Sequence, residues 1–464
     1  MQLITDPRNG VLGFDGSPLR ILNNGGEISL EAYSAYIRGV NGLLGDKAVM
    51  NVGNIKATSS ADLQSEGDIQ LTGDLTAGSS ATLETLSGSS IFVSGNINAQ
   101  NTRIQVDPDA TGKGKNGDIL VEGNVNAGNL ATLRNNTAQG NIYITGSINS
   151  GGMDIAGKNG TILAEGKLET TRQNISLASE TGDIIIEGDL DAKQDLTVKT
   201  GGDGTVILYK DEKINDVMNI HAGRNISLET ENTDIAVGGK IMSDSGNITA
   251  STVKGDIVFL GDAKAGGDII GAVKEKGSII YSGTVVAGGA VMATTPDGMI
   301  GYEGSVEAGN RISAEAGNGW ILYNGNVRAG GNVTALMRNG SIIYANSVNA
   351  GGNVEAKITQ NGNVIYLGTV KAGRNVIADI AVGDIFYGSD VFAGRSVISR
   401  TGSGTIAYMG KVTVGKDLPE QLRKGYGKIA YFDRYGLIGY DKAGVLVPVR
   451  NAKSSEIRVT GVQH

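Results

Sequence analysis

Residues 329–335 read Ala-Gly-Gly-Asn-Val-Thr-Ala. Residues 350–356 and 372–378 repeat this phrase as Ala-Gly-Gly-Asn-Val-Glu-Ala and Ala-Gly-Arg-Asn-Val-Ile-Ala. A shorter form, Ala-Gly-x-x-(Val/Ile), recurs with an almost constant period between Ala265 and Ala393. Self-similarity at a fixed period above roughly twenty residues is the signature of a repeat architecture. The fold is therefore expected to be built from stacked copies of one short unit.

Each repeat contains three short runs in which apolar and polar residues alternate, for example at 340–344, 346–350 and 352–356. A period of two indicates β-strands. Strands this short cannot each bury a face as hairpins. If every strand pairs in parallel with its copy one turn further on, one face is buried continuously. The sequence thus predicts an all-β, right-handed parallel β-helix (solenoid) of ~21-residue coils with three strands each, the hand following the rule for parallel crossovers.

The regularity of the repeat sets the expected domain boundaries. Residues 1–26 contain several turn signals and are expected to form an irregular lead-in or cap. Residues 27–414 are expected to form the β-helix shaft, and residues 415–464 an irregular C-terminal coil or cap. Two intervals in the shaft, from Gly88 to Gly117 and from Gly204 to Thr233, are longer than one period, so loop insertions are expected near 101–116 and 209–219.

A column of tyrosines lies two residues after a column of isoleucines. It has two interpretations: an exposed aromatic strip for sugars, or an interior stack. Alternation places tyrosine and isoleucine on one face, and the same slot holds aliphatic residues in the first half of the chain. We therefore predict buried tyrosines whose hydroxyls reach the edge of the coil to find a partner. The column comprises Tyr281, Tyr302, Tyr323, Tyr344, Tyr366, Tyr387 and Tyr408.

The residue between isoleucine and tyrosine must then face outward, and it is often large and apolar. Such a stripe is longer than the scattered apolar exposure of an ordinary soluble surface. One interpretation is that β-branched residues simply suit a sheet face. The other is a contact stripe for a partner, which makes five residues the candidate binding site: Ile280, Leu322, Ile343, Ile365 and Phe386.

Asparagines at Asn332, Asn353 and Asn375, with Asp268 and Asp417, follow the glycines of the phrase. Asparagine tolerates turn conformations and hydrogen-bonds its own turn, so a structural turn ladder is expected here rather than a functional site.

Composition argues against several other classes of site. The chain has 464 residues, 72 of them glycine, a net charge of −8, no cysteine and two histidines far apart in sequence. These features disfavour nucleic-acid binding, disulfides, thiolate metal sites and histidine-based catalysis. Acid pairs occur at Asp107/Asp109 and Asp211/Glu212, but each lies in a charged loop segment. We expect no enzymatic activity, no catalytic or metal-binding residues and no cofactor.

The phrases at 329–335, 350–356 and 372–378, with Ala-Gly-Arg-Asn-Ile at 222–226, resemble the repeats of filamentous haemagglutinin-like exoproteins. These are the adhesins and contact-dependent toxins of Gram-negative two-partner secretion, and the resemblance covers residues 27–431. It implies a β-helical shaft, secretion through an outer-membrane transporter, an extracellular or bacterial-surface location, and attachment to a host-cell or bacterial receptor or glycan. The family's Asn-Pro-Asn-Leu secretion motif is absent, and the sequence is expected to be an internal piece of a longer chain.

The leading expectation is therefore a non-enzymatic structural and adhesive shaft that mediates attachment or presents a terminal domain, with lateral or end-to-end self-association as a further expectation. Two rival interpretations remain open. One is a polysaccharide-binding or polysaccharide-cleaving β-helix, similar to a phage tailspike or lyase. The other is an intracellular β-helical scaffold.

Overall fold

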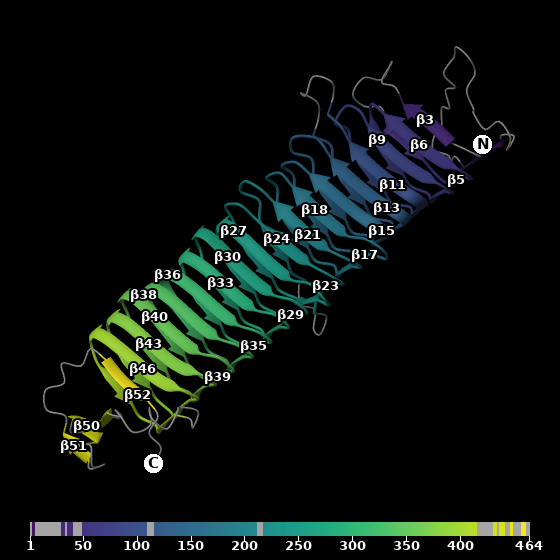
Figure 1. Cartoon of the computed structure of the whole chain (residues 1–464). Coiled ribbons are helices and arrows are strands. Elements are labelled where there is room, and N and C mark those ends of the chain that lie inside the picture. The colour runs from purple at the N-terminus through teal and green to yellow at the C-terminus, as the bar shows by residue number, and fades with distance from the viewer. Residues whose placement is uncertain are drawn as a thin grey trace. The chain divides into compact units, whose positions relative to one another are not determined.

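The computed structural model describes residues 49–108, 116–210 and 217–414, and short strands at 2–4, 29–32, 35–39, 430–433, 436–440, 446–448 and 456–460. The chain divides into two compact units. Unit 1 comprises Met1–Thr233 and Gly238–Lys240, and unit 2 comprises Asp234–Val237 and Ile241–His464. The described residues form strands and turns but no helix (Figure 1). The Asp109, Asp211 and Glu212 positions lie outside the described residues.

Each unit is a stack of coils, and each coil has three strands that we call A, B and C. In one coil of unit 2 these are residues 342–344 of β38, then β39 (Val348–Ala350) and β40 (Val354–Asn361). Each pairs in parallel with its copy one coil later, in β41, β42 and β43. The prediction of a parallel β-solenoid with one sequence repeat per coil is confirmed.

The strands of unit 1 form three parallel ladders. The A ladder comprises β4 (Val49–Val52), β7 (Asp68–Leu71), β10 (Ile91–Val93), β12 (Ile119–Val121), β14 (Ile142–Ile144), β16 (Ile162–Ala164), β19 (Ile184–Ile186) and β22 (Val206–Leu208). The B ladder comprises β1 (Gln2–Ile4), β2 (Ser29–Ala32), β5 (Ile55–Ala57), β8 (Leu75–Ala77), β17 (Leu168–Thr170), β20 (Leu190–Ala192) and β23 (Asn219–Ala222). The C ladder comprises β3 (Ala35–Gly39), β6 (Ser60–Ser65), β9 (Ser80–Thr85), β18 (Ile175–Ser179), β21 (Leu196–Thr200) and β24 (Ile226–Glu229). Three long strands belong to both the B and C ladders: β11 (Ile97–Val106), β13 (Val125–Asn135) and β15 (Ile148–Gly157).

Unit 2 repeats this plan. Its A ladder comprises β25 (Ile235–Val237), β28 (Ile257–Phe259), β31 (Ile279–Tyr281), β34 (Ile300–Tyr302), β41 (Val364–Tyr366), β44 (Ile385–Tyr387) and β47 (Ile406–Tyr408). Its B ladder comprises β26 (Lys240–Ser243), β29 (Ala263–Ala265), β32 (Val285–Ala287), β35 (Val306–Ala308), β37 (Val327–Ala329), β39, β42 (Val370–Ala372), β45 (Val391–Ala393) and β48 (Val412–Val414). Its C ladder comprises β27 (Ile248–Lys254), β30 (Ile269–Lys276), β33 (Val291–Asp297), β40, β43 (Asn375–Val382) and β46 (Ser396–Ser403). Two strands run from the C ladder into the next A strand: β36 (Ile312–Tyr323) and β38 (Val333–Tyr344).

Near the C-terminus the strand pairing changes direction. The last described strand, β52 (Glu456–Thr460), pairs antiparallel with β46. Three further strands form a separate antiparallel sheet: β49 (Ala430–Asp433), β50 (Gly436–Tyr440) and β51 (Leu446–Pro448). An antiparallel strand on β46 occupies backbone groups that an edge strand would otherwise leave unpaired.

In the shaft, residues 101–106, which the sequence places in the first insertion, form the C part of β11. They pair in register with β9 and β13. The residues between Pro108 and Asn116 lie outside the described part. At the second insertion, residues 211–216 lie outside it, and Asn219 already begins β23.

The interior follows the alternation predicted from the sequence. In unit 2 the isoleucine column of the A strands and the valine columns of the B and C strands are buried in every described coil. The alanines of the C strands, such as Ala335 and Ala356, are also buried. The two units fill the interior of their coils with different side chains. In unit 1 the C strands contribute large residues such as Leu177 and Val198, whereas in unit 2 tyrosines of the A strands face alanines. In unit 2, a large side chain from the A strand is thus paired with a small one from the C strand, which keeps the interior of each coil closely packed.

Glycines at the corner between the B and C strands allow the coils to stack closely. A Cβ atom on Gly330 would lie 2.1 Å from the carbonyl oxygen of Gly309, the equivalent residue one coil earlier. Gly351 has the same relation to Gly330, again at 2.1 Å. Any side chain here would push neighbouring coils apart, which explains why the second residue of the phrase is glycine.

The asparagine column does form a ladder, but it joins successive coils rather than closing its own turns. The side-chain oxygen of Asn332 accepts a hydrogen bond from the backbone N–H of Asn353 (2.9 Å), and Asn353 accepts from that of Asn375 (3.1 Å). Asp268 accepts from Ala290 in the same way (2.7 Å). The expectation of own-turn bonding was wrong because parallel stacking places the next coil's N–H group within reach. Asp417 lies outside the described residues.

Candidate functional site

The five residues of the predicted contact stripe lie on one ladder of unit 2. Ile280, Leu322, Ile343, Ile365 and Phe386 each occupy the middle of an A strand, between two buried neighbours. Their side chains point away from the core and are partly exposed.

These residues are neighbours in register rather than isolated positions. Leu322 pairs with Ile343, Ile343 with Ile365, and Ile365 with Phe386. Gly301 fills the rung between Ile280 and Leu322. From Leu322 to Phe386 the ladder is therefore a continuous apolar strip, and Gly301, which has no side chain, separates it from Ile280.

The tyrosines that flank this stripe in sequence point the opposite way. All seven are buried, and with Phe259 they form one stack whose ring centroids are 4.6–5.1 Å apart and nearly parallel. The prediction of an interior stack is confirmed, which leaves no exposed aromatic strip at these positions.

The prediction of hydroxyl partners was wrong for five of the seven. Ser399 lies within hydrogen-bonding distance of the hydroxyls of Tyr387 (3.1 Å) and Tyr408 (2.7 Å). The hydroxyls from Tyr281 to Tyr366 contact no hydrogen-bonding partner among the described residues. The reason is the facing column, which offers alanine or glycine in those coils and serine only at 399.

Burial raises the pKa of every tyrosine in the stack above its ordinary value. For most of them, the neighbouring tyrosine hydroxyls add to this effect. The phenols are therefore neutral near pH 7, and the stack serves as apolar core rather than as an acid or base.

Asp107 is the described member of the acid pairs. Its carboxylate accepts hydrogen bonds from Gln105 Nε2 (2.5 Å) and Asn136 Nδ2 (2.6 Å). These contacts tie the start of the first insertion to the coils beside it.

Unit 2 also carries a shallow groove of about 450 Å³ along the corner between the B and C strands. Its floor is the exposed glycine column, including Gly309 and Gly330. Its wall is formed by outward side chains of four successive B strands: Val286, Glu307, Arg328 and Asn349. The groove exists because the corner glycines carry no side chain.

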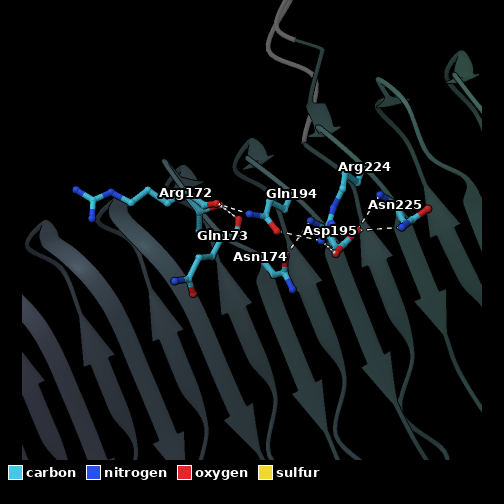
Figure 2. Close-up of polar contacts among 8 residues, drawn as sticks. Arg172, Gln173, Asn174, Gln194, Asp195, Arg224 and Asn225 are labelled. Carbon is cyan, nitrogen blue, oxygen red and sulfur yellow. Dashed lines mark hydrogen bonds and ion pairs between the residues drawn. The ribbon is translucent and has the colours of Figure 1, made fainter.

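The corresponding corner of unit 1 is filled with polar side chains from three successive coils (Figure 2). Gln194 Nε2 donates to the carbonyl of Arg172 (2.8 Å), and Arg224 donates to Gln194 Oε1 (2.9 Å). Arg224 also pairs with Asp195 at 2.6 Å, and Asn225 donates to Asp195 through backbone (3.1 Å) and side chain (3.0 Å).

Two opposing effects act on the Asp195 carboxyl. Burial alone would raise its pKa, but the hydrogen bonds from Asn225 and the Arg224 guanidinium together lower it. Asp195 is therefore ionised at neutral pH, and it connects two coils through charge-assisted hydrogen bonds.

Beside this corner, the outward faces of the B strands hold a polar cluster that sequence reasoning missed. Glu169, Asp191 and His221 occupy the same position on three neighbouring B strands. His221 Nδ1 lies 2.8 Å from Asp191 Oδ1, and Lys167 Nζ lies 2.7 Å from Glu169 and 3.9 Å from Asp191. A carboxylate that orients an imidazole is a common part of acid–base sites. No group of three or more His, Asp or Glu side chains suited to hold a metal occurs among the described residues.

No protein-family model, curated protein or solved structure matches the chain. Within the described ranges, no helix is long and apolar enough to cross a membrane.

Proposed function

We propose that this chain is a non-enzymatic shaft of a large bacterial exoprotein, secreted or displayed at the cell surface, which mediates attachment or presents a terminal domain. The observation that carries the proposal is the stack of in-register coils. Its buried columns, corner glycines and polar ladders all join one coil to the next. A repeat unit of this kind adds length without a new core. The apolar stripe of unit 2 is the surface proposed for partner contact.

The resemblance of the glycine phrases to filamentous haemagglutinin-like repeats supports the finer proposal. On that basis the partner is a receptor or glycan on a host cell or bacterium, and export uses an outer-membrane transporter. The phrase is short and rich in glycine, and close coil stacking alone requires those glycines.

Attachment is tested by flow cytometry of animal cells and Gram-negative bacteria incubated with fluorescently labelled chain. We expect saturable binding that unlabelled chain displaces. A lack of saturable binding to both would contradict the adhesive role and leave only the spacer role. Antibody labelling of intact and lysed source cells tests the location: labelling that requires lysis would favour the intracellular scaffold.

Polysaccharide cleavage is the second candidate, and the cluster of Lys167, Glu169, Asp191 and His221 favours it. Carbohydrate-cleaving sites use clustered carboxylates, and here two lie on adjacent rungs beside an imidazole. Release of reducing ends from bacterial surface glycans, lost in Asp191→Asn, would establish this activity and refute the non-enzymatic proposal.

A further inference from the structure

The outward face of the A ladder in unit 2 gathers most of the exposed apolar side chains of that unit. Leu260, Leu367 and Met409 each follow an A strand by one residue and are 53%, 50% and 68% exposed. Trp320 lies two residues before Leu322 in β36 and is 55% exposed. These are four of the six large apolar residues found exposed among the described residues of unit 2. They add apolar side chains beside the central stripe at four rungs, while most other residues of these two flanking columns are small or polar.

This face also lacks basic side chains. Across the eight rungs from 256–260 to 405–409, there is no lysine or arginine. Asp256 and Asp384 each accept a backbone N–H bond from the next coil at 2.7 Å. Glu303 is the remaining carboxylate. A long apolar column bordered by exposed large apolar side chains marks an interaction site.

The equivalent face of unit 1 is different. Its central column is also apolar, with Leu120, Leu163 and Ile185, but Glu122, Glu165 and Glu187 stand two residues further on. Two copies of that face brought together would place carboxylates of like sign in one contact, which opposes association. Apart from carboxylates that bond the next coil, the face of unit 2 has one such residue, Glu303, so two copies of it meet with less repulsion.

We propose that the A face of unit 2 is the contact between two copies of this chain in a two-fold symmetric dimer. The proposal rests on the proposed role of the stripe as a contact surface, and it commits that surface to one occupant. A flat face with few charges and an apolar central column can pack against its own copy, and a two-fold contact uses the same patch on both partners.

The size of the face agrees with a dimer of moderate stability. Eight rungs spaced about 4.8 Å apart extend about 38 Å, and five residues of extended chain span about 17 Å. The footprint is thus about 650 Å² per copy, at the lower end of the roughly 600–1,000 Å² per partner in specific interfaces. Association is therefore expected to depend visibly on concentration.

Sedimentation velocity of the purified chain over a wide concentration range tests the proposal. We expect a monomer–dimer equilibrium that high salt leaves intact or strengthens, because the contact is apolar. The variant Ile343→Thr/Ile365→Thr/Phe386→Thr is expected to stay monomeric throughout. Its thermal unfolding midpoint should stay close to that of wild type, because these side chains lie outside the core.

The matched control is Leu120→Thr/Leu163→Thr/Ile185→Thr, which makes the same change at the same strand position in unit 1. It is expected to dimerise like wild type. A monomeric wild type, dimers that dissolve in salt, or equal loss of dimer in both variants would overturn the proposal.

The outcomes also separate this proposal from the proposed function. A dimer that binds no cells would contradict attachment and leave the dimer contact standing. A monomer that binds cells, and loses that binding in the unit 2 variant, would assign the face to a surface receptor and overturn the dimer.

Discussion

Replacing Ala335 with serine is expected to stabilise unit 2, although it places a polar group in the core. Ser399 shows why: its hydroxyl lies between those of Tyr387 and Tyr408. Ala335 has the same spacing from Tyr323 and Tyr344 that Ser399 has from its own two tyrosines, and both of these hydroxyls are buried without a described partner. Ala335→Ser should give them one.

The expected gain follows from two new hydrogen bonds. A typical intramolecular hydrogen bond contributes about 0.5–1.5 kcal/mol net, and these two tyrosine hydroxyls are already desolvated. The serine must itself be buried, so we expect an increase of about 1–2 kcal/mol in the free energy of unfolding. For a unit of this size the midpoint should rise by about 2–8 °C. The converse change, Ser399→Ala, removes a shared partner and should cost about 1–3 kcal/mol.

Thermal unfolding followed by near-ultraviolet circular dichroism suits this test, because the tyrosine stack contributes to the signal. The control is Ala335→Ser in a Tyr323→Phe/Tyr344→Phe background, where the serine has no hydroxyl to meet and should destabilise. A double-mutant cycle isolates the interaction. If the serine lowers stability equally in both backgrounds, the hydroxyls do not converge on this position and the reasoning fails.

Three further predictions concern the corners and the stack. Gly330→Ala should lower the free energy of unfolding by about 2–3 kcal/mol, because the added Cβ would lie 2.1 Å from a carbonyl oxygen. At Gly301 the nearest atom to an added Cβ is 3.9 Å away, so Gly301→Ala should change the free energy of unfolding by less than about 0.5 kcal/mol. Urea unfolding of the two variants compares these values. The pKa of Asp195 is lowered in the folded state, so its contribution to the free energy of unfolding is present above the ordinary aspartate pKa and is lost as the pH falls through the folded-state pKa. Asp195→Asn should therefore reduce the loss of stability at acidic pH, measured as the free energy of unfolding against pH. Above about pH 10 tyrosines in the unfolded chain lose their protons, whereas the buried tyrosines of the stack keep theirs, so the free energy of unfolding should fall as pH rises above this value. An absorbance titration should show the stacked tyrosines ionising only when the chain unfolds. Ionisation with an ordinary pKa in the folded state would contradict their burial.

The sequence was sufficient to predict the strands and the direction of their side chains. A two-residue alternation within each repeat places Ile342 and Tyr344 inside and Ile343 outside, and the structure agrees. This succeeds because a solenoid repeats one local environment, so every coil adds evidence about the same column.

The features that the sequence did not predict are contacts between residues in different columns or different coils. Whether a tyrosine hydroxyl has a partner is decided by a residue on another strand, and only Ser399 in that column provides one among the described coils. The pair of Asp191 and His221 was hidden because their separation along the chain exceeds one repeat period, so the second insertion obscures their register. Asn332 bonds the next coil because parallel stacking places the N–H group of that coil within hydrogen-bonding distance.

The pairing of each coil with the next has a consequence for how the chain folds. Although the protein is all-β in its described part, most strand partners within each unit are separated along the chain by a single repeat period. A period of about 21 residues, set against a length of 464 residues, gives a relative contact order of about 0.05, below even the range of helical bundles. Folding can thus advance by adding one coil to the last, with a short loop to close each time. A chain emerging gradually from a narrow opening could fold in this way before its remaining residues have appeared.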